Sequence, residues 1–421
     1  MQVRCTQAHL CACPRYVVGL ALAAIGNIAS PDISRDLAPE VQKHLRNTNH
    51  FIRKKAALTC TRMFRKVPEL VDDLVPRLSL SDGHHSVLLT AVTMLIAAAQ
   101  TRASIIPRIK KLVPSLVKIL RKVVNAKRNH SRDYDVGNVC DPFLQSGILR
   151  LLSILGHNDP TVSEQMRDVL TSVSTNTDTS KNAGNAIMYD CVRTIMNVES
   201  EPALRILGIN RLGAFLINKD NNIRYIGLQT LCEVAKTDLK AVRRHRATIV
   251  HCLRDPDISI RRRAFELVFL LVNKESVEAL TREMVNYLRV AGPEDRAELC
   301  AKICTIVDNH CPSVQWQIET LITVLAIAAQ DCKPDAQSSL LYHISQAPEL
   351  QGFFTHQLFA MTVQSRKQLD LVHAAVWCVG EFGEVRDNRL PCAVLCCVCS
   401  VCCVSLLVYW VSPRSPNWTQ C

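Results

Sequence analysis

Glycine and aromatic residues are scarce in this sequence of 421 residues. The 14 glycines make up about 3% of the chain, against an average near 7%, which argues against sandwiches and barrels built from many short strands. Aromatic residues make up 5% and do not alternate with basic positions, so the sequence does not support a stacking platform for single-stranded nucleic acid. With 48% of residues apolar, the chain is predicted to fold, and to fold as helices.

Catalytic and cofactor motifs are also missing. The sequence has no G-x-G-x-x-G, G-x-x-x-x-G-K-[ST], H-E-x-x-H or G-x-S-x-G, so the common nucleotide, zinc-protease and serine-hydrolase sites lack their minimal residues. We therefore expect a protein that is not an enzyme and that holds no cofactor.

The strongest metal candidate is the set Cys300, Cys304, His310 and Cys311, because cysteines four residues apart share one face of a helix. We favour the alternative, in which both Cys300 and Cys304 belong to an apolar core stripe. Two overlapping C-x-x-C spacings near the C-terminal end have no histidine nearby, so we expect no metal site there either.

The 20 cysteines do not indicate a secreted disulfide scaffold. The first residues lack an apolar core followed by a small-residue cleavage site, which favours a reducing, cytosolic compartment. Seven cysteines crowd the end of the chain from Cys392 onward, so that stretch differs in kind from the rest.

A short pattern, D-x-x-I-R-x-x-small, recurs along the chain. It spans residues 220–227 and 257–264, which are 37 residues apart, and a related copy spans residues 49–56. The Asp or Asn suits a helix N-cap, the apolar residue begins a buried stripe, and the small residue lets a neighbouring helix approach. The Arg is expected to face outward or to cap a neighbouring repeat. We predict that Ile223 and Ile260 are buried and that Arg224 and Arg261 occupy equivalent positions.

A helix pair repeating every 37–40 residues is typical of HEAT and armadillo arrays, in which each pair buries its apolar face against its neighbours. We predict an all-α fold, a right-handed HEAT/armadillo-like solenoid, over residues 15–384. The alternative is an ordinary globular helical domain. Residues 125–141 are polar and break the pattern, which predicts an exposed loop. Apolar stripes with a helical period mark the expected helices; they cover residues 16–28, 86–99, 112–124, 143–156, 187–196, 264–272, 319–329 and 372–380.

The chain carries 50 Lys and Arg against 38 Asp and Glu, a net charge of +12. Several basic runs stand out: 53–55, 65–66, 110–111, 121–122, 127–128, 243–246 and 261–263. Such runs could face phosphates, anionic lipids or an acidic protein, or else form solvated faces and ion pairs with residues such as Asp255 and Asp257. As a candidate partner or lipid surface we single out Arg53, Lys54, Lys55, Arg243, Arg244, Arg246, Arg261, Arg262 and Arg263.

Several segments resemble gamma-adaptin, the large subunit of the heterotetrameric clathrin adaptor of the trans-Golgi network and endosomes. They include AVWCVGE at residues 375–381 and residues 65–70, 141–145, 148–152, 176–177, 179–182, 184–187, 222–225 and 244–246. The resemblance implies a scaffold of a vesicle coat that acts in intracellular protein transport and catalyses nothing. It implies as partners a beta-type adaptin, a sigma small subunit and a mu medium subunit, and indirectly an Arf-type GTPase and the anionic Golgi membrane. Clathrin would be contacted only through family regions that this sequence lacks.

The sequence departs from this family at both ends. Residues 1–14 form a divergent start, and no family site residue has a counterpart here to carry over. Residues 385–421 form an unrelated, Cys-rich hydrophobic tail. Its stretch 390–411 has no charge and is long enough to span a membrane as a helix, with Tyr409 and Trp410 at its end. A translated intron or a shifted reading frame is the competing explanation of this tail.

These observations leave three functional hypotheses. The first is the adaptor scaffold, on the cytoplasmic face of the trans-Golgi network, endosomes and clathrin-coated vesicles. The second is a HEAT-repeat transport receptor or nucleic-acid-binding scaffold that uses the basic runs. The third is a tail-anchored membrane form, anchored through residues 390–411.

Overall fold

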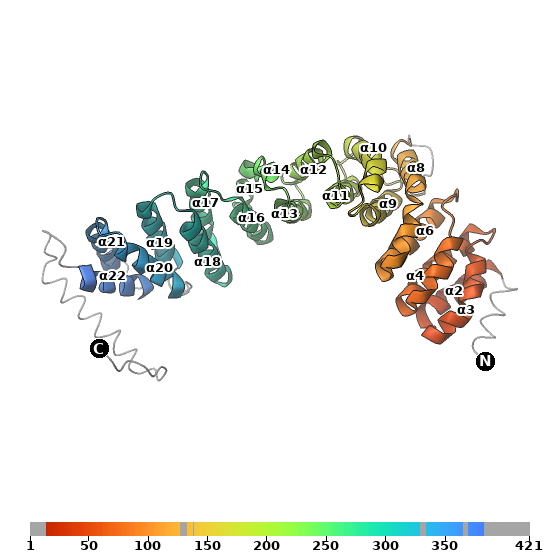
Figure 1. The fold of residues 1–421 in the computed structure, drawn as a ribbon, viewed down its shortest axis with the longest axis horizontal. Helices are drawn as coiled ribbons and strands as arrows, with labels where there is room; N and C mark the ends of the chain where they lie inside the picture. Colours follow the sequence, from red (N-terminus) through yellow and green to blue (C-terminus); the bar gives the residue numbers. More distant parts are fainter. Residues whose placement is uncertain (1–13, 127–132, 138, 329–333, 365–368, 383–421) are drawn as a thin grey trace. The chain divides into compact units, whose positions relative to one another are not determined.

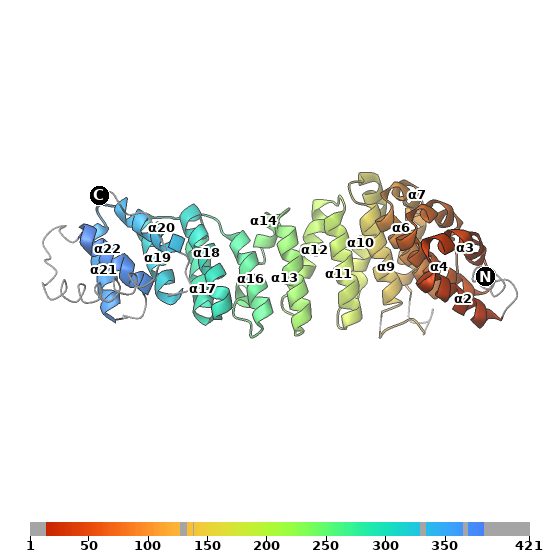
Figure 2. The ribbon, with the colours of Figure 1, turned by 90° about the horizontal axis from the view of Figure 1, so that it is seen from below.

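The computed structural model describes residues 14–126, 133–137, 139–328, 334–364 and 369–382. Within these ranges the chain is almost entirely helical and contains no strand, and Val136 and Val139 form an isolated antiparallel bridge. The chain divides into two compact units, residues 1–248 (unit 1) and 249–421 (unit 2). Within each unit the helices lie side by side in chain order, as an α-solenoid requires (Figures 1 and 2).

The helices of unit 1 follow one another with short connections. In chain order they are α2 (Arg15–Ile28), α3 (Pro31–His44), α4 (His50–Lys66), η1 (Pro68–Leu70), α5 (Val71–Leu74), η2 (Val75–Arg77), α6 (His85–Thr101), η3 (Ala103–Ile105), α7 (Ile106–Lys110), α8 (Val113–Val124), α9 (Pro142–Leu155), α10 (Pro160–Asn176), α11 (Asn182–Asn197), α12 (Pro202–Phe215), α13 (Asn221–Ala235) and α14 (Leu239–Arg243).

The next helix, α15 (Arg246–Cys252), crosses the boundary between the units. The remaining helices of unit 2 are α16 (Ile258–Leu271), α17 (Val277–Val290), α18 (Pro293–His310), α19 (Val314–Ala328), α20 (Pro334–Ser345), α21 (Gln351–Gln364) and α22 (Leu369–Phe382). The apolar stripes read from the sequence all coincide with helices of the two units, which confirms the helical assignment.

Three helices begin with the same capping geometry. The N-cap residues of α4, α13 and α16 are Asn49, Asp220 and Asp257, and each side chain accepts a hydrogen bond from the backbone N–H two residues later. Such a bond satisfies one of the amides that a helix start leaves without a partner. The recurring motif therefore marks helix starts, as its sequence predicts.

The arginine four residues after each cap completes this geometry. Nη1 of Arg53, Arg224 and Arg261 donates to two backbone carbonyls in the turn before its own helix. The six N···O distances lie between 2.7 and 3.1 Å; the acceptors are Asn47, Thr48, Asn218, Lys219, Asp255 and Pro256. The predicted equivalence of Arg224 and Arg261 is confirmed, but the side chain locks its own turn instead of capping a neighbouring repeat. We call this arrangement the arginine lock.

The buried stripes of α13 and α16 also correspond along their length, with one exception. Ile260 is fully buried, whereas Ile223 is only half-buried, so the prediction for Ile223 is wrong. A side chain in the first turn has no preceding turn to cover it, and its burial depends on what neighbouring helices contribute. The small residue of the motif behaves as expected at Gly227, where an added Cβ would lie 3.1 Å from the Cβ of Phe215 in α12.

The segment predicted as an exposed loop, residues 125–141, lies between α8 and α9 and falls partly outside the described residues. It ends at Asp141, which is buried, caps α9 in a left-handed conformation (φ 35°) and pairs with Nδ1 of His85 at 2.8 Å. The tail of residues 385–421, with its predicted membrane span 390–411, lies outside the described residues. In the part that the structure describes, no helix is both long enough and apolar enough to cross a membrane.

Candidate interaction surfaces

The first basic group lies on α4, and its members have different surroundings. Arg53 is the arginine of a lock and also pairs with Asp82, at 2.7 Å from both Nε and Nη2. Its side chain is only 19% exposed, so a partner cannot reach most of it. The ammonium groups of Lys54 and Lys55 lie 5.7 and 5.8 Å from the centre of the Phe51 ring, and both residues are half-buried.

The arginines of the third group, on α16, are held by different contacts. Arg261 belongs to a lock, and its guanidinium lies 5.9 Å from the ring centre of Tyr287. Arg262 pairs with Asp295 of α18 through two N···O contacts of 2.8 Å, and this contact raises the pKa of the guanidinium. Arg263 pairs with Glu266, one turn further along the same helix, at 2.7 Å. These contacts neutralise much of the charge that the run contributes.

The second group lies at the junction of α14 and α15. Arg243 is half-buried, whereas Arg244 and Arg246 are exposed. Between them, the His245 ring packs against α12, where an added Cβ on Gly213 would lie 2.4 Å from ring atoms. Burial, and secondly the charge of Arg244, lower the pKa of His245 below its ordinary value, so the ring is neutral near pH 7.

The nine predicted residues therefore lie on three separate helical segments, two in unit 1 and one in unit 2. Of these residues, Arg244 and Arg246 are exposed and form no ion pair with any residue that the structure describes. The assignment of the nine residues to a partner or lipid surface remains a prediction.

The candidate metal ligands are divided between core and surface. Cys300 and Cys304 are buried in α18 with Leu299, Ile303 and Val307, whereas Cys311, just beyond the helix, is exposed. Among the described residues, no group of three His, Cys, Asp or Glu side chains is arranged to hold a metal ion. The positions of Cys300 and Cys304 fit the core stripe that we favoured from sequence.

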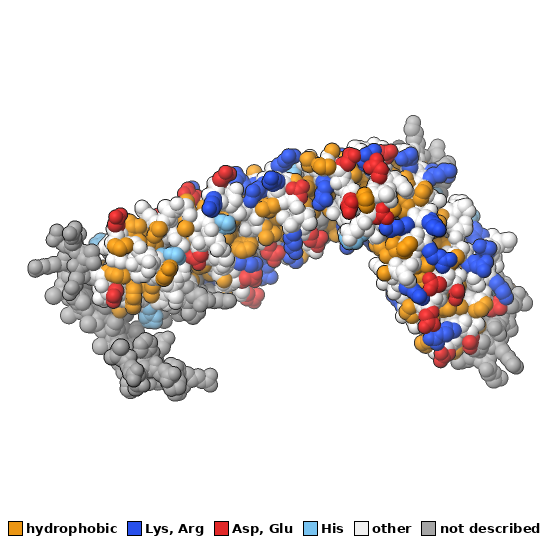
Figure 3. Space-filling model, in the orientation of Figure 1, with side chains coloured by type: hydrophobic (Ala, Val, Ile, Leu, Met, Phe, Trp, Pro, Cys, Tyr) orange, Lys and Arg blue, Asp and Glu red, His pale blue; other side chains and the backbone are white. Residues whose placement is uncertain are grey.

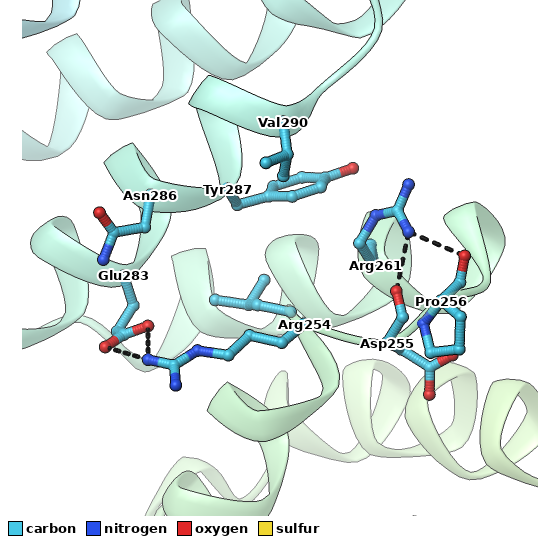
Figure 4. A pocket seen from close by; sticks show the side chains of 9 residues that line it. Arg254, Asp255, Pro256, Arg261, Glu283, Asn286, Tyr287 and Val290 are labelled. Carbon is cyan, nitrogen blue, oxygen red and sulfur yellow. Dashed lines mark hydrogen bonds and ion pairs between the residues drawn. The ribbon is translucent and has the colours of Figure 1, made fainter.

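A pocket of about 400 Å³ opens in unit 2, between α17 and the turn that precedes α16 (Figure 4). Leu253, Pro256, Tyr287 and Val290 give it apolar walls. At its rim Nη2 of Arg254 donates to both carboxylate oxygens of Glu283, at 2.7 and 2.8 Å. The pocket thus offers an apolar interior and a neutralised rim, which suits contact with another chain more than chemistry on a substrate.

Tyr287 is the buried polar residue of this pocket. It is 2% exposed, and its hydroxyl has no hydrogen-bond partner within the described structure. Burial, and secondly the nearby Asp295 carboxylate, raise the pKa of the hydroxyl above its ordinary value, so it stays protonated. Sequence reasoning missed the pocket because its residues come from separate segments; the nearest signal was Arg261, which belongs to the recurring motif and also lines the pocket.

Comparison with known proteins agrees with this helical architecture. The family described as "Adaptin N terminal region" matches residues 14–404. This range runs past residue 384, where we place the end of the solenoid, and that boundary remains a prediction. By structure, a homology model of the full-length AP-3 complex in an intermediate open conformation aligns with a TM-score of 0.64 over 94% of this chain and 70% of that chain. At 19% identity this likeness concerns the fold alone.

Two relatives show the sequence similarity. "AP-1 complex subunit gamma" of Dictyostelium discoideum is 43% identical over 396 residues, which are 93% of this chain and 44% of that protein. "AP-1 complex subunit gamma-like 2" of Homo sapiens is 41% identical over 371 residues, 88% of this chain and 47% of that protein. The chain thus spans about half the length of the curated relatives it matches. The resemblance to gamma-adaptin is confirmed: the chain belongs to the adaptin family, as a member that carries the adaptin N-terminal region.

Proposed function

We propose that this chain is a non-enzymatic scaffold subunit of a clathrin adaptor coat that acts in vesicle-mediated intracellular protein transport. The observation that carries the proposal is the 43% identity to an AP-1 gamma subunit, which extends over 93% of this chain and across both units. A match of that length covers the helices and their exposed faces as well as the core. Surfaces through which a gamma subunit assembles are therefore expected to be retained.

The architecture supports a scaffold. A solenoid buries each helix against its neighbours and leaves long exposed faces, on which partners bind by shape and charge. The proposed partners are a beta-type adaptin, a sigma small subunit and a mu medium subunit. The proposed place of action is the cytoplasmic face of the trans-Golgi network, endosomes and clathrin-coated vesicles, reached with an Arf-type GTPase and the anionic Golgi membrane.

Co-expression with tagged sigma and beta subunits tests this proposal. We expect the chain to co-elute with both at moderate salt and to remain with them when salt is raised. A variant with a charged residue in the core, Leu152→Asp, serves as the unfolded control, because Leu152 is fully buried in α9. Recovery of nucleic acid alone, lost as salt rises, would favour the nucleic-acid scaffold and overturn the adaptor proposal.

A second test concerns location. A fluorescent fusion of the chain, expressed with its proposed partners, should concentrate on trans-Golgi and endosomal membranes. Inhibition of Arf nucleotide exchange should disperse it into the cytosol. A diffuse signal that ignores Arf inhibition would contradict the proposed location, and retention in the membrane pellet after alkaline carbonate extraction would support the tail-anchored hypothesis instead.

A further inference from the structure

One stretch of the sequence is strongly basic and lies apart from the nine residues considered above. Residues 103–132 contain no Asp, Glu, Phe, Tyr or Trp. Their basic residues are Arg108, Lys110, Lys111, Lys118, Arg121, Lys122, Lys127, Arg128 and Arg132. On the face shown in Figure 3, Lys and Arg side chains gather over the part of unit 1 that contains α6 and α8.

The fold separates this stretch into a buried and an exposed face. The apolar face of α8 packs into the core of unit 1 through Val113, Leu116, Val117, Leu120 and Val123. Lys118, Arg121 and Lys122 are spaced three and four residues apart, so they share the opposite, exposed face. Arg108 and Lys111, at and just after α7, are exposed as well. We call Arg108, Lys111, Lys118, Arg121 and Lys122 the α8 basic stripe.

Little within the described structure neutralises this stripe. Arg121 approaches Asp168 of α10 only to 3.9 Å, and both side chains are more than half exposed. The other four cations form no ion pair with a described residue. The neighbouring Lys110, which is not part of the stripe, forms an ion pair with Asp159 at 2.5 Å. Exposed cations attract an anionic ligand, and the attraction is weakened by salt.

The borders of the stripe decide what kind of anion fits. On the α10 side stand the carboxylates of Asp168 and Glu164, which are 73% and 60% exposed. A flat anionic membrane would press against the exposed carboxylate of Asp168, whereas Glu164 is paired with Arg167 at 2.9 Å. No large apolar side chain of described residues 103–126 is exposed for insertion into a bilayer, and without aromatic residues the stripe cannot stack on bases. A narrow ligand that follows α8 avoids these penalties.

The spacing of the cations matches one such ligand. Lys118 and Lys122 are four residues apart, a rise of about 6 Å along a helix. In an extended peptide, side chains on one face repeat every two residues, about 6.8 Å apart. We propose that the α8 basic stripe binds an extended segment of a partner protein in which acidic residues alternate with small polar ones.

The test uses the full chain without adaptor subunits, so its result does not depend on the proposed function. The probe is a fluorescein-labelled peptide of alternating Glu and Ser, and binding is followed by fluorescence anisotropy at low and at physiological salt. A matched peptide of alternating Gln and Ser has the same length and no charge. We expect saturable, salt-sensitive binding of the Glu peptide and none of the Gln peptide.

Charge reversal locates the site. The triple variant Lys111→Glu, Lys118→Glu, Lys122→Glu should bind the Glu peptide about tenfold or more weakly, because three attractive contacts become repulsive. The matched control Lys236→Glu, Lys240→Glu, Arg289→Glu has the same net charge and alters exposed positions elsewhere. It should bind within about twofold of the wild type. Circular dichroism and thermal melting confirm that both variants fold.

Several results would overturn the inference. Equal weakening in both triple variants would show a response to net charge alone. Carbodiimide cross-linking of the Glu peptide must join it to Lys111, Lys118 or Lys122; mass spectrometry that places the links only on other lysines would refute the site. Tighter binding of phosphatidylserine vesicles or duplex DNA than of the peptide, lost in the stripe variant, would assign the stripe to a membrane or to nucleic acid instead.

Discussion

The arginine lock of α4 leads to a quantitative prediction. In Arg53→Met the apolar stem of the side chain is kept, but the guanidinium that bonds the carbonyls of Asn47 and Thr48 at 2.8 Å is lost. So is its contact with Asp82, whose side chain is only 10% exposed. Hydrogen bonds to a charged group contribute roughly 1.5–3 kcal/mol each, and an unpaired, mostly buried carboxylate adds a penalty. Allowing for partial exposure, we expect the opening free energy of the first turn of α4 to fall by about 2–4 kcal/mol.

Hydrogen–deuterium exchange with mass spectrometry measures this opening directly, with α9 as the internal reference. The neighbouring residue is the matched control: Lys54→Met removes only a cation–π contact at 5.7 Å and should cost less than about 1 kcal/mol. Arg53→Lys should recover only part of the lost free energy, because an ammonium keeps the positive charge but lacks the planar fork of the guanidinium.

The same reasoning ranks the locks. Arg261→Met loses two carbonyl bonds, at 2.7 and 2.9 Å, and a distant ring contact, but no ion pair like that of Asp82. It should therefore destabilise its helix start by less than Arg53→Met does. If Arg53→Met speeds exchange no more than Lys54→Met, or if the order of the two locks is reversed, the guanidinium does not hold the turn and the reasoning fails.

Three further changes test other parts of the structure. Gly184→Ala should destabilise unit 1 by about 2 kcal/mol or more in denaturant titration, since the new Cβ would lie 1.8 Å from a backbone carbonyl oxygen, while Gly292→Ala, with no atom within 4 Å, should have little effect. Burial raises the pKa of the Cys60 thiol from 9.0 to about 12, so the protonated thiol contributes its full stabilisation below pH 9 and this stabilisation is lost as the pH rises from 9 to 12. Over that pH range the denaturation midpoint of the Cys60→Ala variant should therefore fall less than that of the wild type. A double-mutant cycle on Arg262 and Asp295 should give a small favourable coupling that shrinks as salt is raised, because Arg262 is 48% exposed; a coupling that does not change with salt would contradict a solvent-screened pair.

The features that sequence predicted well are those set by nearby residues. The caps at Asp220 and Asp257 and the equivalent positions of Arg224 and Arg261 follow from local spacing, whereas the bonds of each arginine to its own preceding turn were not predicted. The buried stripes were equally readable, because a helical period shows which side of each helix must be covered.

The features that sequence missed depend on how separate helices meet. Arg262 finds Asp295 33 residues away, in α18, and nothing in the run of three arginines indicates that partner. Tyr287 lines a pocket together with the residues of a turn that lies some thirty residues earlier in the sequence. The predicted burial of Ile223 is wrong for the same reason, because its exposure is set by neighbouring helices and not by the motif that contains it.

The fate of a basic residue in this solenoid depends on its register. An arginine four residues after an Asn or Asp N-cap, such as Arg53 or Arg261, turns back onto the preceding carbonyls and is not available to a partner. In the middle of a helix the backbone carbonyls are already hydrogen-bonded, so a cation such as Lys118 finds no free carbonyl to bind. It stays in solvent unless an acidic residue stands beside it. Counting basic residues therefore overestimated the positive charge that α4 and α16 offer to a partner and underestimated the charge that α8 offers, where the register leaves a row of cations exposed. A partner that recognises charge on this chain should therefore be sought at exposed cations that have no carbonyl or carboxylate acceptor, such as Lys118 and Lys122 of α8.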